Sequence, residues 1–448
     1  MGNRKLIVMS NDALVYEDLE VLREMPTFKQ FYPHMAMVRG MRTIYPSVTY
    51  PVHCSIASGC YPDKTGVITN EKVIPGQRKT PWYWFHDACR CEDLFDAAHR
   101  AGRKTAAVFW PCTGNHPSID YLIDEFWPGK AAATAEEAFR RSGTSQELYD
   151  TVVRRYLPGV TIRRHPETDQ FIVDCACDII RTYQPDLLML HPGNVDSARH
   201  HSGVFSREVT GAVRHIDGWL LQLISACRNA GTLDDTVFAL ISDHGQMDVV
   251  RSVNLNVLFA KSGLIEVNEQ GEVTGWKAWS HSSGLSAQIY LRDPADGETR
   301  DTVRKLLDQA VEDGIYGIGS YMTEEEAEKK EHLAGPFSFI AESDGYTSFA
   351  DAWTGPVCGS LDSSDYRTGH ATHGHLPDRG PQPPLFLFGP GIREKAVLDR
   401  RPIVDEAPTF ARILGVSLPH ADGTCMDELL CPKQAKLVRD NFGIIFEG

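Results

Sequence analysis

The sequence predicts an α/β fold: a doubly wound, mostly parallel sheet with helices on both faces, plus a small inserted α+β cap. Two observations predict this class. Short apolar runs without polar alternation recur along the chain, as expected of strands whose two faces are both buried. Segments with apolar residues at helical spacing lie between these runs, and strands that alternate with helices usually form a parallel sheet.

Five apolar runs are the predicted strands of this sheet. In chain order they span residues 6–10, 105–110, 186–191, 236–242 and 384–389, and each is rich in Leu, Ile, Val or Phe. Two segments between them carry clear helical patterns. Residues 91–101 are followed by Gly102 and residues 206–230 by Gly231, and glycine is favoured just past the end of a helix.

Two segments do not fit this alternation. Residues 113–180 are polar and helix-rich in pattern, which predicts an insertion within the core. Residues 256–335 contain a strand-like run at 286–291 and helical patterns at 298–312 and 323–331, which predicts the α+β cap. The core is therefore expected to consist of residues 1–255 and 336–448, and selectivity to reside in the two inserted segments.

The composition is that of a globular protein, with 42% apolar and 23% charged residues among 448. The net charge of −15 and the pI near 5.6 argue against a partner that is a nucleic-acid polymer. They allow a small anionic substrate, because bound cations reverse the local field. The 11 cysteines show no paired spacing of a metal site, which favours reduced, mostly buried thiols.

The apolar run near the N-terminus is too short for the core of a signal peptide, and no segment has the apolar length needed to span a bilayer. We therefore expect a cytoplasmic protein with no membrane partner, unless an export signal has been removed. The oligomeric state is left open by the sequence.

Polar residues follow two of the predicted strands at the edge where ligands bind in α/β sheets. Asp12 follows the first strand, although an aspartate at this point is also common in turns. Asp243 and His244 follow the strand at 236–242 and precede a permissive glycine. Packing hardly explains this pair, because buried Asp and His are unfavourable unless they are paired or coordinated.

Two further groups contain histidines. Asp196 and His200 follow the strand at 186–191 and converge on one metal if their segment is helical, although the neighbouring His201 leaves the ligating histidine open. Three histidines lie within residues 370–375, which indicates either metal binding or an exposed histidine-rich loop. The core strand that follows closely favours metal binding.

Thr49 is expected at the N-terminus of a helix, since Pro51 suits a first turn and Gly59 suits the helix end. Free backbone N–H groups and the helix dipole favour an anion at this position. A plain N-cap threonine is the alternative reading of this segment alone.

Taken together and in this order, these segments resemble the type I phosphodiesterase/nucleotide pyrophosphatase family of the alkaline phosphatase superfamily. The resemblance covers most of the chain outside the two insertions, and residues 60–67 also look like the family's stretch after the nucleophile helix. The sequence departs from the family at Val52, Gln246, His375 and residues 64–65. These departures leave every proposed ligand intact and bear on the substrate.

The resemblance implies a site with two zinc ions, in whose place manganese or iron is also possible. It implies that one ion is bound by Asp12, Thr49, Asp243 and His244, and the other by Asp196, His200 and His373. Thr49 would also be the nucleophile, and Asn70 would stabilise a phosphoryl oxygen. Tyr50 would stack against the substrate. Trp110, Tyr121 and Trp127 could line the pocket, although such aromatics are more often part of a core.

The implied activity is metal-dependent hydrolysis of phosphodiester or pyrophosphate bonds in small nucleotide-like substrates, through a phospho-threonine intermediate. A phosphonate hydrolase acting on compounds such as phosphonoacetate, or a phosphomonoesterase, would use the same site. A non-catalytic metal- or phosphate-binding protein is disfavoured by the intact nucleophile. A sulfatase would need a modified Cys or Ser, and a cofactor-independent phosphoglycerate mutase uses Ser where Thr49 stands.

Overall fold

The computed structural model describes residues 4–127, 134–431, 437–440 and 443–446. Its centre is an eight-stranded sheet in the order β19-β2-β18-β6-β1-β5-β3-β4. The strands are β1 (Lys5–Ser10), β2 (Ala36–Arg42), β3 (Thr105–Val108), β4 (Tyr121–Ile123), β5 (Leu187–Leu190), β6 (Thr236–Ile241), β18 (Leu385–Phe388) and β19 (Val397–Pro402). Within this sheet β18 alone runs antiparallel to its neighbours.

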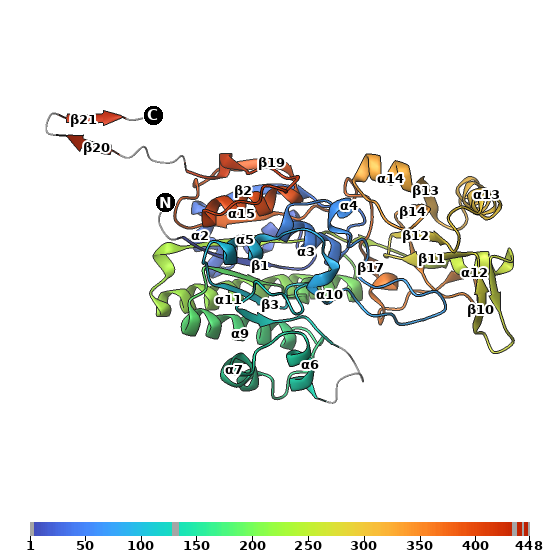
Figure 1. The fold of residues 1–448 in the computed structure, drawn as a ribbon, viewed down its shortest axis with the longest axis horizontal. Helices are drawn as coiled ribbons and strands as arrows, with labels where there is room; N and C mark the ends of the chain where they lie inside the picture. The colour runs from blue at the N-terminus through green and yellow to red at the C-terminus, as the bar shows by residue number, and fades with distance from the viewer. Residues whose placement is uncertain (1–3, 128–133, 432–436, 441–442, 447–448) are drawn as a thin grey trace.

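Helices cover both faces of the sheet, because successive side chains of a strand point to opposite sides. In β1, Ile7 and Met9 pack into one core, and Leu6 and Val8 pack into another. The first core contains α1 (Leu19–Leu22), α2 (Pro26–Phe31), α9 (Glu167–Tyr183) and α11 (Arg207–Ala230), and the second contains α3 (Thr49–Ser58), α5 (Leu94–Arg100) and α15 (Glu406–Leu414). Figure 1 shows the long helices α9 and α11 on one side and α5 and α15 on the other. The predicted α/β class is confirmed.

All five predicted strands are present, with ends within two residues of the predicted ones. The reversed direction of β18 was not evident from its sequence, because a buried strand is uniformly apolar in either direction. Strands β2, β4 and β19 were not predicted. Arg39 and Gly40 interrupt the apolar run of β2, and β19 carries charged residues and a proline, as edge strands often do.

The region predicted as a helix-rich insertion contains β4, α6 (Ala135–Arg141), α7 (Gln146–Leu148), α8 (Arg154–Tyr156) and most of α9. A π-helical turn at Tyr149–Val153 joins α7 to α8. The amphipathic helix α9 packs against α11 and the strands β3 and β5. This last part of the region therefore belongs to the central layers of the fold.

A second lobe is built on a four-stranded antiparallel sheet in the order β11-β12-β14-β13 (Figure 1). Its elements are α12 (Leu255–Lys261), β11 (Ala278–Ser282), β12 (Ser286–Leu291), α13 (Gly297–Asp313), β13 (Ile318–Thr323), α14 (Glu324–Glu331) and β14 (Phe339–Ser343). The lobe has its own core, which includes Phe259, Leu307 and Phe339. Strand β14 comes from beyond residue 335, the predicted end of the cap.

Short strands complete the structure. Strands β8 (Arg251–Asn254), β15 (Thr347–Ala350) and β16 (Cys358–Gly359) form one small sheet, β9 (Ile265–Val267) pairs with β10 (Val273–Trp276), β7 (Met247–Asp248) with β17 (Ala371–Thr372), and β20 (Leu437–Asp440) with β21 (Gly443–Phe446). The short helix α4 (Pro62–Thr65) and α10 (Asn194–Ser202) flank α3 and β5 in the chain.

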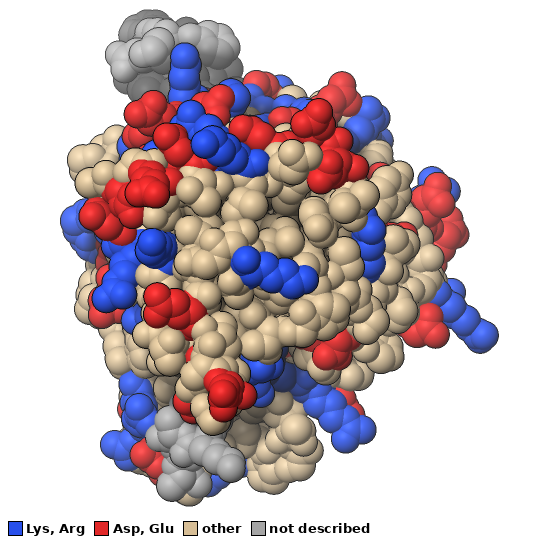
Figure 2. Space-filling model, turned by 90° about the vertical axis from the view of Figure 1, so that its right-hand side faces the viewer, with Lys and Arg blue, Asp and Glu red and all other residues tan. Residues whose placement is uncertain are grey.

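The surface carries charges of both signs. On the face shown in Figure 2, acidic and basic side chains of the described residues are interspersed, without a continuous basic surface of the kind that binds nucleic-acid polymers. In the part of the chain that the structure describes, no helix combines the length and the apolar composition needed to cross a membrane.

Candidate metal centre

Three adjacent strands bring the predicted metal ligands to one edge of the sheet. Strand β1 lies between β6 and β5, and all three end at the same edge because they are parallel. Asp12 lies two residues past β1, and Asp243 lies two residues past β6. Helix α10, which begins shortly after β5, carries Asp196 and His200 one turn apart.

The first group consists of Asp12, Asp243 and His244, which are buried and whose potential ligand atoms lie within 4.8 Å of one another. His244 Nε2 lies 3.2 Å from Asp243 Oδ2 and 3.7 Å from Asp12 Oδ1. The hydroxyl of Thr49 is 3.3 Å from the same nitrogen. The backbone N–H of Ala13 donates to Asp243 Oδ1 at 3.1 Å and so orients this carboxylate.

The second group consists of Asp196, His200 and His373, again with potential ligand atoms within 4.8 Å of one another. His200 Nε2 is 3.1 Å from Asp196 Oδ1, and His373 Nε2 is 3.9 Å from it. The predicted convergence of Asp196 and His200 arises because their segment is helical. His200 Nδ1 donates to the carbonyl of Ala371 at 2.7 Å, which leaves Nε2 directed at the site.

The antiparallel pair β7–β17 places His373 at the site. In this pair Thr372 lies opposite Met247, so His373 follows directly beside the segment that carries Asp243 and His244. The rings of His244 and His373 are 4.2 Å apart between centroids. The two groups are therefore neighbours in one site, and the structure brings together all seven residues that the resemblance assigned to the metals.

The carboxylates of the site are crowded by like charges. Burial, followed by the charges of Asp196 and Asp243, raises the pKa of Asp12 well above its usual value. Burial also raises the pKa of Asp243. Burial acts in the same direction on Asp196, but His200 and His373 outweigh it, so the pKa of Asp196 is lowered. Divalent cations between these groups would relieve the repulsion and hold the carboxylates ionised.

The imidazoles of the site are mostly held neutral. Burial lowers the pKa of His244 to about 3 and lowers the pKa of His373 well below its usual value. For His200 burial is again the largest influence, but the charge of Asp196 overrides it and raises the pKa. A metal ligand must be a neutral imidazole, so His244 and His373 are prepared for that role.

Two buried carboxylate oxygens, Asp12 Oδ1 and Asp243 Oδ2, make no hydrogen bond within the described structure. Such atoms are unfavourable in a protein interior unless a cation or hydrogen-bond donor reaches them. Three carboxylates with three imidazoles form the mixed oxygen and nitrogen donor set that zinc, manganese or iron can use. The residues present therefore fit two divalent metal ions.

Thr49 is the first residue of helix α3, all of whose residues are buried, and Gly59 closes the helix at a φ of 72° as predicted. The side chain of Asn70 is oriented by this helix, since Asn70 Oδ1 accepts the backbone N–H of Tyr50 at 2.9 Å. The amide nitrogen of Asn70 is then the group that can donate elsewhere. The start of α3 therefore offers a hydroxyl, backbone donors and a fixed amide at one point.

His53 anchors α3 to the sheet beneath the site, a role that the sequence did not indicate. Its Nδ1 donates to the carbonyl of Thr49 at 2.8 Å, and its Nε2 lies 2.9 Å from the hydroxyl of Ser10 at the end of β1. Burial lowers the pKa of His53 to about 3, so the ring is neutral and can accept at Nε2. Thr49 is thereby held at a fixed height above β1.

Gly374 is required for the position of His373, which gives a first prediction. Its φ is +90°, and a Cβ there would lie 1.9 Å from the carbonyl oxygen of Ser283. We expect Gly374→Ala to lower the free energy of unfolding by at least about 2 kcal/mol, measured by urea denaturation. The control Gly218→Ala adds a methyl group within α11 where no atom lies within 4 Å. It should be neutral or stabilising by about 1 kcal/mol; equal midpoints for Gly374→Ala and the parent would contradict the prediction.

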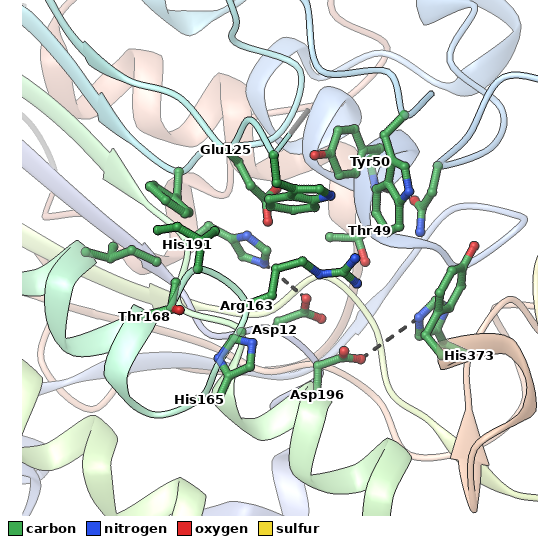
Figure 3. A pocket seen from close by; sticks show the side chains of 18 residues that line it. Asp12, Thr49, Tyr50, Glu125, Arg163, His165, Thr168, His191, Asp196 and His373 are labelled. Carbon is green, nitrogen blue, oxygen red and sulfur yellow. Dashed lines mark hydrogen bonds and ion pairs between the residues drawn. The ribbon is translucent and has the colours of Figure 1, made fainter. Parts of the chain in front are cut away.

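A pocket opens directly above the two groups. It is lined by Asp12, Thr49, Tyr50, Asn70, Trp82, Phe109, Glu125, Trp127, Ile162, Arg163, His165, Thr168, Ile172, His191, Gly193, Asp196, Tyr366 and His373. Figure 3 shows Asp12, Thr49, Asp196 and His373 around its floor, with Glu125 and Tyr50 above. Seven of the lining residues lie within the segment 113–180, and none lies within 256–335. The first insertion, but not the predicted cap, therefore borders this pocket.

Of the four aromatic residues expected at the pocket, Tyr50 and Trp127 line it, and Trp110 and Tyr121 do not. Trp127 lines the pocket, but Trp110 does not: it is 1% exposed, and its ring meets the edge of His53 at 4.7 Å. The structure therefore places Trp110 in the core instead of at the substrate. Tyr50 lines the pocket but is fully buried, and its ring contacts the edge of Trp82 at 5.1 Å. Tyr121 stacks on Tyr183, away from the pocket.

Trp82, Tyr366, Glu125, Arg163 and His191 are pocket residues that sequence reasoning missed. Trp82, Trp127 and Tyr366 are half-buried and adjacent, with Trp82 5.7 Å from Trp127 and 5.8 Å from Tyr366 between ring centroids. Such a wall can pack against a flat aromatic group. His191 Nε2 lies 3.2 Å from Asp12 Oδ2, and burial lowers the pKa of this histidine to about 3.

Comparison with known proteins identifies the family to which this geometry is related. The model of the family described as type I phosphodiesterase/nucleotide pyrophosphatase matches residues 6–375. Human ectonucleotide pyrophosphatase/phosphodiesterase family member 1 is 23% identical over 218 residues, which are 46% of this chain and 20% of that protein. Venom phosphodiesterase CdcPDE of Crotalus durissus collilineatus is 21% identical over 240 residues, which are 50% of this chain and 24% of that protein. The matches thus span less than a quarter of these relatives.

Solved structures are similar over almost the whole chain. An inactive variant of murine ectonucleotide pyrophosphatase/phosphodiesterase 5, in complex with AMP, superposes with a TM-score of 0.68 at 15% identity, covering 95% of this chain and 100% of that chain. The human protein of the same description superposes with a TM-score of 0.66 at 15% identity. At this identity the likeness establishes the fold.

Proposed function

The chain belongs to the type I phosphodiesterase/nucleotide pyrophosphatase family, and on this premise we propose that it is a metal-dependent hydrolase. It cleaves phosphodiester or pyrophosphate bonds in small, nucleotide-like substrates. The observation that supports this proposal most strongly is the pair of buried Asp/His groups beside the hydroxyl of Thr49, at the N-terminus of a buried helix. No other part of the described pocket offers a nucleophile next to such a concentration of ligands.

Two divalent cations, for which we propose zinc, would be held by the two groups of ligands. Asp12, Asp243, His244 and Thr49 would bind one ion, and Asp196, His200 and His373 the other. When bound, the ions would favour ionisation of a hydroxyl and stabilise negative charge on the attacking and leaving oxygens of an in-line displacement. The fixed hydrogen bonds of Asp243 to Ala13 and of His200 to Ala371 keep these ligands oriented.

Thr49 is proposed as the nucleophile. Its Oγ1 releases its proton to the solvent and forms a bond to phosphorus while the bond from phosphorus to the leaving oxygen breaks. This yields a phospho-threonine, and the leaving oxygen takes up a proton from the solvent as the alcohol or phosphate departs. Asn70, oriented by the backbone of Tyr50, would donate its amide N–H to a non-bridging phosphoryl oxygen, where charge accumulates in the transition state. Water then attacks phosphorus from the opposite side, the bond to Thr49 breaks, and the hydroxyl regains its proton.

The shape of the pocket supports a substrate with an aromatic group. Trp82, Trp127 and Tyr366 form a half-buried wall beside the phosphoryl site, against which a nucleobase or aryl group can pack. The related structure of murine protein 5 was obtained in complex with AMP. Both observations support a nucleotide-like substrate for this chain. The cytoplasmic location expected from the N-terminal sequence stays a prediction.

The activity is tested by comparing hydrolysis of bis-(4-nitrophenyl) phosphate, 4-nitrophenyl phosphate and phosphonoacetate, before and after treatment with a chelator. We expect kcat/KM for the diester to exceed that for the monoester by at least about tenfold. Chelation should abolish the activity, and added zinc should restore it. Hydrolysis of phosphonoacetate alone would favour the phosphonate alternative, and no hydrolysis with or without zinc would contradict the proposal.

A further inference from the structure

Arg163 is a cation at the mouth of the pocket to which the proposed chemistry gives no role. It lies just before α9 and lines both the pocket at Thr49 and an adjoining cavity, which is lined in part by Arg78, Lys79 and Arg367. Trp82, Trp127 and Tyr366 are likewise common to both spaces. Figure 3 shows the Arg163 side chain reaching across the pocket over Asp12 toward Thr49.

The guanidinium of Arg163 has no carboxylate within 4.0 Å among the residues that the structure describes. Arg367 in the adjoining cavity is different, because its Nη1 lies 2.8 Å from Asp351 and 3.2 Å from Glu71. Arg163 instead lies over the indoles of Trp127 and Trp82, at 5.0 Å and 5.7 Å from their ring centroids. Contact through the guanidinium face leaves its N–H edge free to donate to a planar or tetrahedral anion.

The backbone also presents this side chain in a fixed way. Arg163 has a φ of +71°, an uncommon conformation for a residue other than glycine. The same segment is tied to α10 through Asp169, which accepts from His165 Nδ1 at 2.6 Å and from the backbone N–H of Gly193 at 2.7 Å. The base of Arg163 is therefore connected to the helix that carries Asp196.

None of the acidic residues of the pocket forms an ion pair with Arg163 in the part of the chain that the structure describes. Asp12 and Asp196 would be engaged by metal ions in the proposed function. Glu125 is the third carboxyl group of the pocket; burial is the largest influence on its pKa and raises it well above the usual value, although the charge of Arg163 acts in the opposite direction. Arg163 therefore adds positive charge to a pocket that already attracts one phosphoryl group.

We propose that Arg163 binds a second anionic group of the substrate, next to the scissile phosphoryl group, and so selects pyrophosphates and comparable dianionic substrates over simple aryl diesters. The guanidinium edge suits two oxygens of a phosphate or a carboxylate, which share this chemistry. The inference rests on the proposed function, because it concerns substrates of the same pocket.

The test uses Arg163→Asn, because asparagine tolerates a left-handed backbone but its side chain is too short to reach the same point. Three substrates are compared: diadenosine diphosphate, phosphonoacetate, and thymidine 5′-(4-nitrophenyl) phosphate, which lacks a second anion. We expect the ratio of kcat/KM for diadenosine diphosphate to that for the nitrophenyl ester to fall about 10- to 100-fold in the variant. A fall confined to phosphonoacetate would identify the second anion as a carboxylate. Arg163→Lys should recover part of the loss, since it keeps the charge but not the planar fork.

Arg164→Asn is the matched control. Arg164 is the next residue and is exposed like Arg163, but it lies outside both cavities and pairs with Glu167 at 3.3 Å, so the same change of charge should leave the substrate ratio as in the parent. The inference would be overturned if Arg163→Asn changed kcat/KM for diadenosine diphosphate and for phosphonoacetate, each relative to that for the nitrophenyl ester, by less than about threefold.

Calorimetric measurement of substrate binding to Thr49→Ala separates failure of the inference about Arg163 from failure of the proposed function. If the parent hydrolyses none of the three substrates, the proposed function fails. The affinity of Thr49→Ala for diadenosine diphosphate should still fall about tenfold when Arg163→Asn is added. An unchanged affinity would overturn the inference independently of turnover.

Discussion

Thr49→Ala is expected to lower kcat for the best phosphodiester substrate by at least about 10³-fold while the metal content of the protein is unchanged. In the proposed mechanism this hydroxyl forms the phospho-enzyme, and it lies 3.3 Å from His244 Nε2. The three carboxylates and three imidazoles of the site are untouched by this change. Turnover and elemental analysis on the same preparation separate the loss of the nucleophile from the loss of metal.

Two further variants make this result specific. Ser55→Ala also removes a hydroxyl from α3, but Ser55 lies outside the pocket and its hydroxyl has no hydrogen-bond partner among the residues that the structure describes, so activity should be retained. Thr49→Ser keeps an oxygen nucleophile and should recover a large part of kcat. Hydrolysis by Thr49→Ala at the rate of the parent would show that another group, or water directly, attacks phosphorus.

The central strands could be predicted because strands with two buried faces are uniformly apolar. Strands β1, β5 and β6 satisfy this condition, and their ends locate Asp12, the start of α10 and Asp243. The edge of the sheet could not be predicted in the same way. Strand β19 has no fully buried residue and carries Asp399, Arg400 and Arg401, so its pattern resembles that of a loop.

The candidate ligands could be predicted because each lies next to a recognisable element. The remainder of the pocket depends on contacts between distant segments, which no local pattern records. Trp82 and Tyr366 meet in space at 5.8 Å although nearly 300 residues separate them. Arg163 lies in an irregular polar segment whose composition is that of an exposed loop, and only the fold places it above Asp12.

Trp110 is a residue that the sequence predicted at the pocket and that the structure places in the core. Its position at the end of the predicted strand 105–110 suggested a residue at the ligand-binding edge, but β3 ends at Val108 and the chain then takes a φ of 58° at Phe109. The indole consequently enters the core beside His53. A one-residue change in direction after a strand decides which side chain faces the pocket, and such a change has no clear signal in the sequence.

Asp243→Asn and His373→Ala are each expected to reduce the bound metal from about two ions per chain to about one, with a loss of kcat of at least about 10³-fold. Asp243 belongs to the group beside Thr49, and His373 to the group on α10, so each variant removes a ligand from only one group. An amide is a poor substitute for a carboxylate at a buried cation, and a methyl group supplies no ligand. Elemental analysis after equilibration with zinc and dialysis measures the content.

A buried histidine outside the two groups provides the control for this metal loss. His281 is buried 3.5 Å from Asp351 and belongs to none of the potential metal groups of the described residues, so His281→Ala should keep the full metal content even if it lowers stability. The two ligand variants also predict different residual behaviour. Asp243→Asn removes the ion beside the nucleophile, whereas His373→Ala leaves that ion in place and should retain more activity toward a substrate with an activated leaving group such as nitrophenolate. Undiminished metal content in both variants would mean that Asp243 and His373 are not ligands, and the proposed chemistry would lose its basis, because Thr49 alone has no means of ionising at neutral pH.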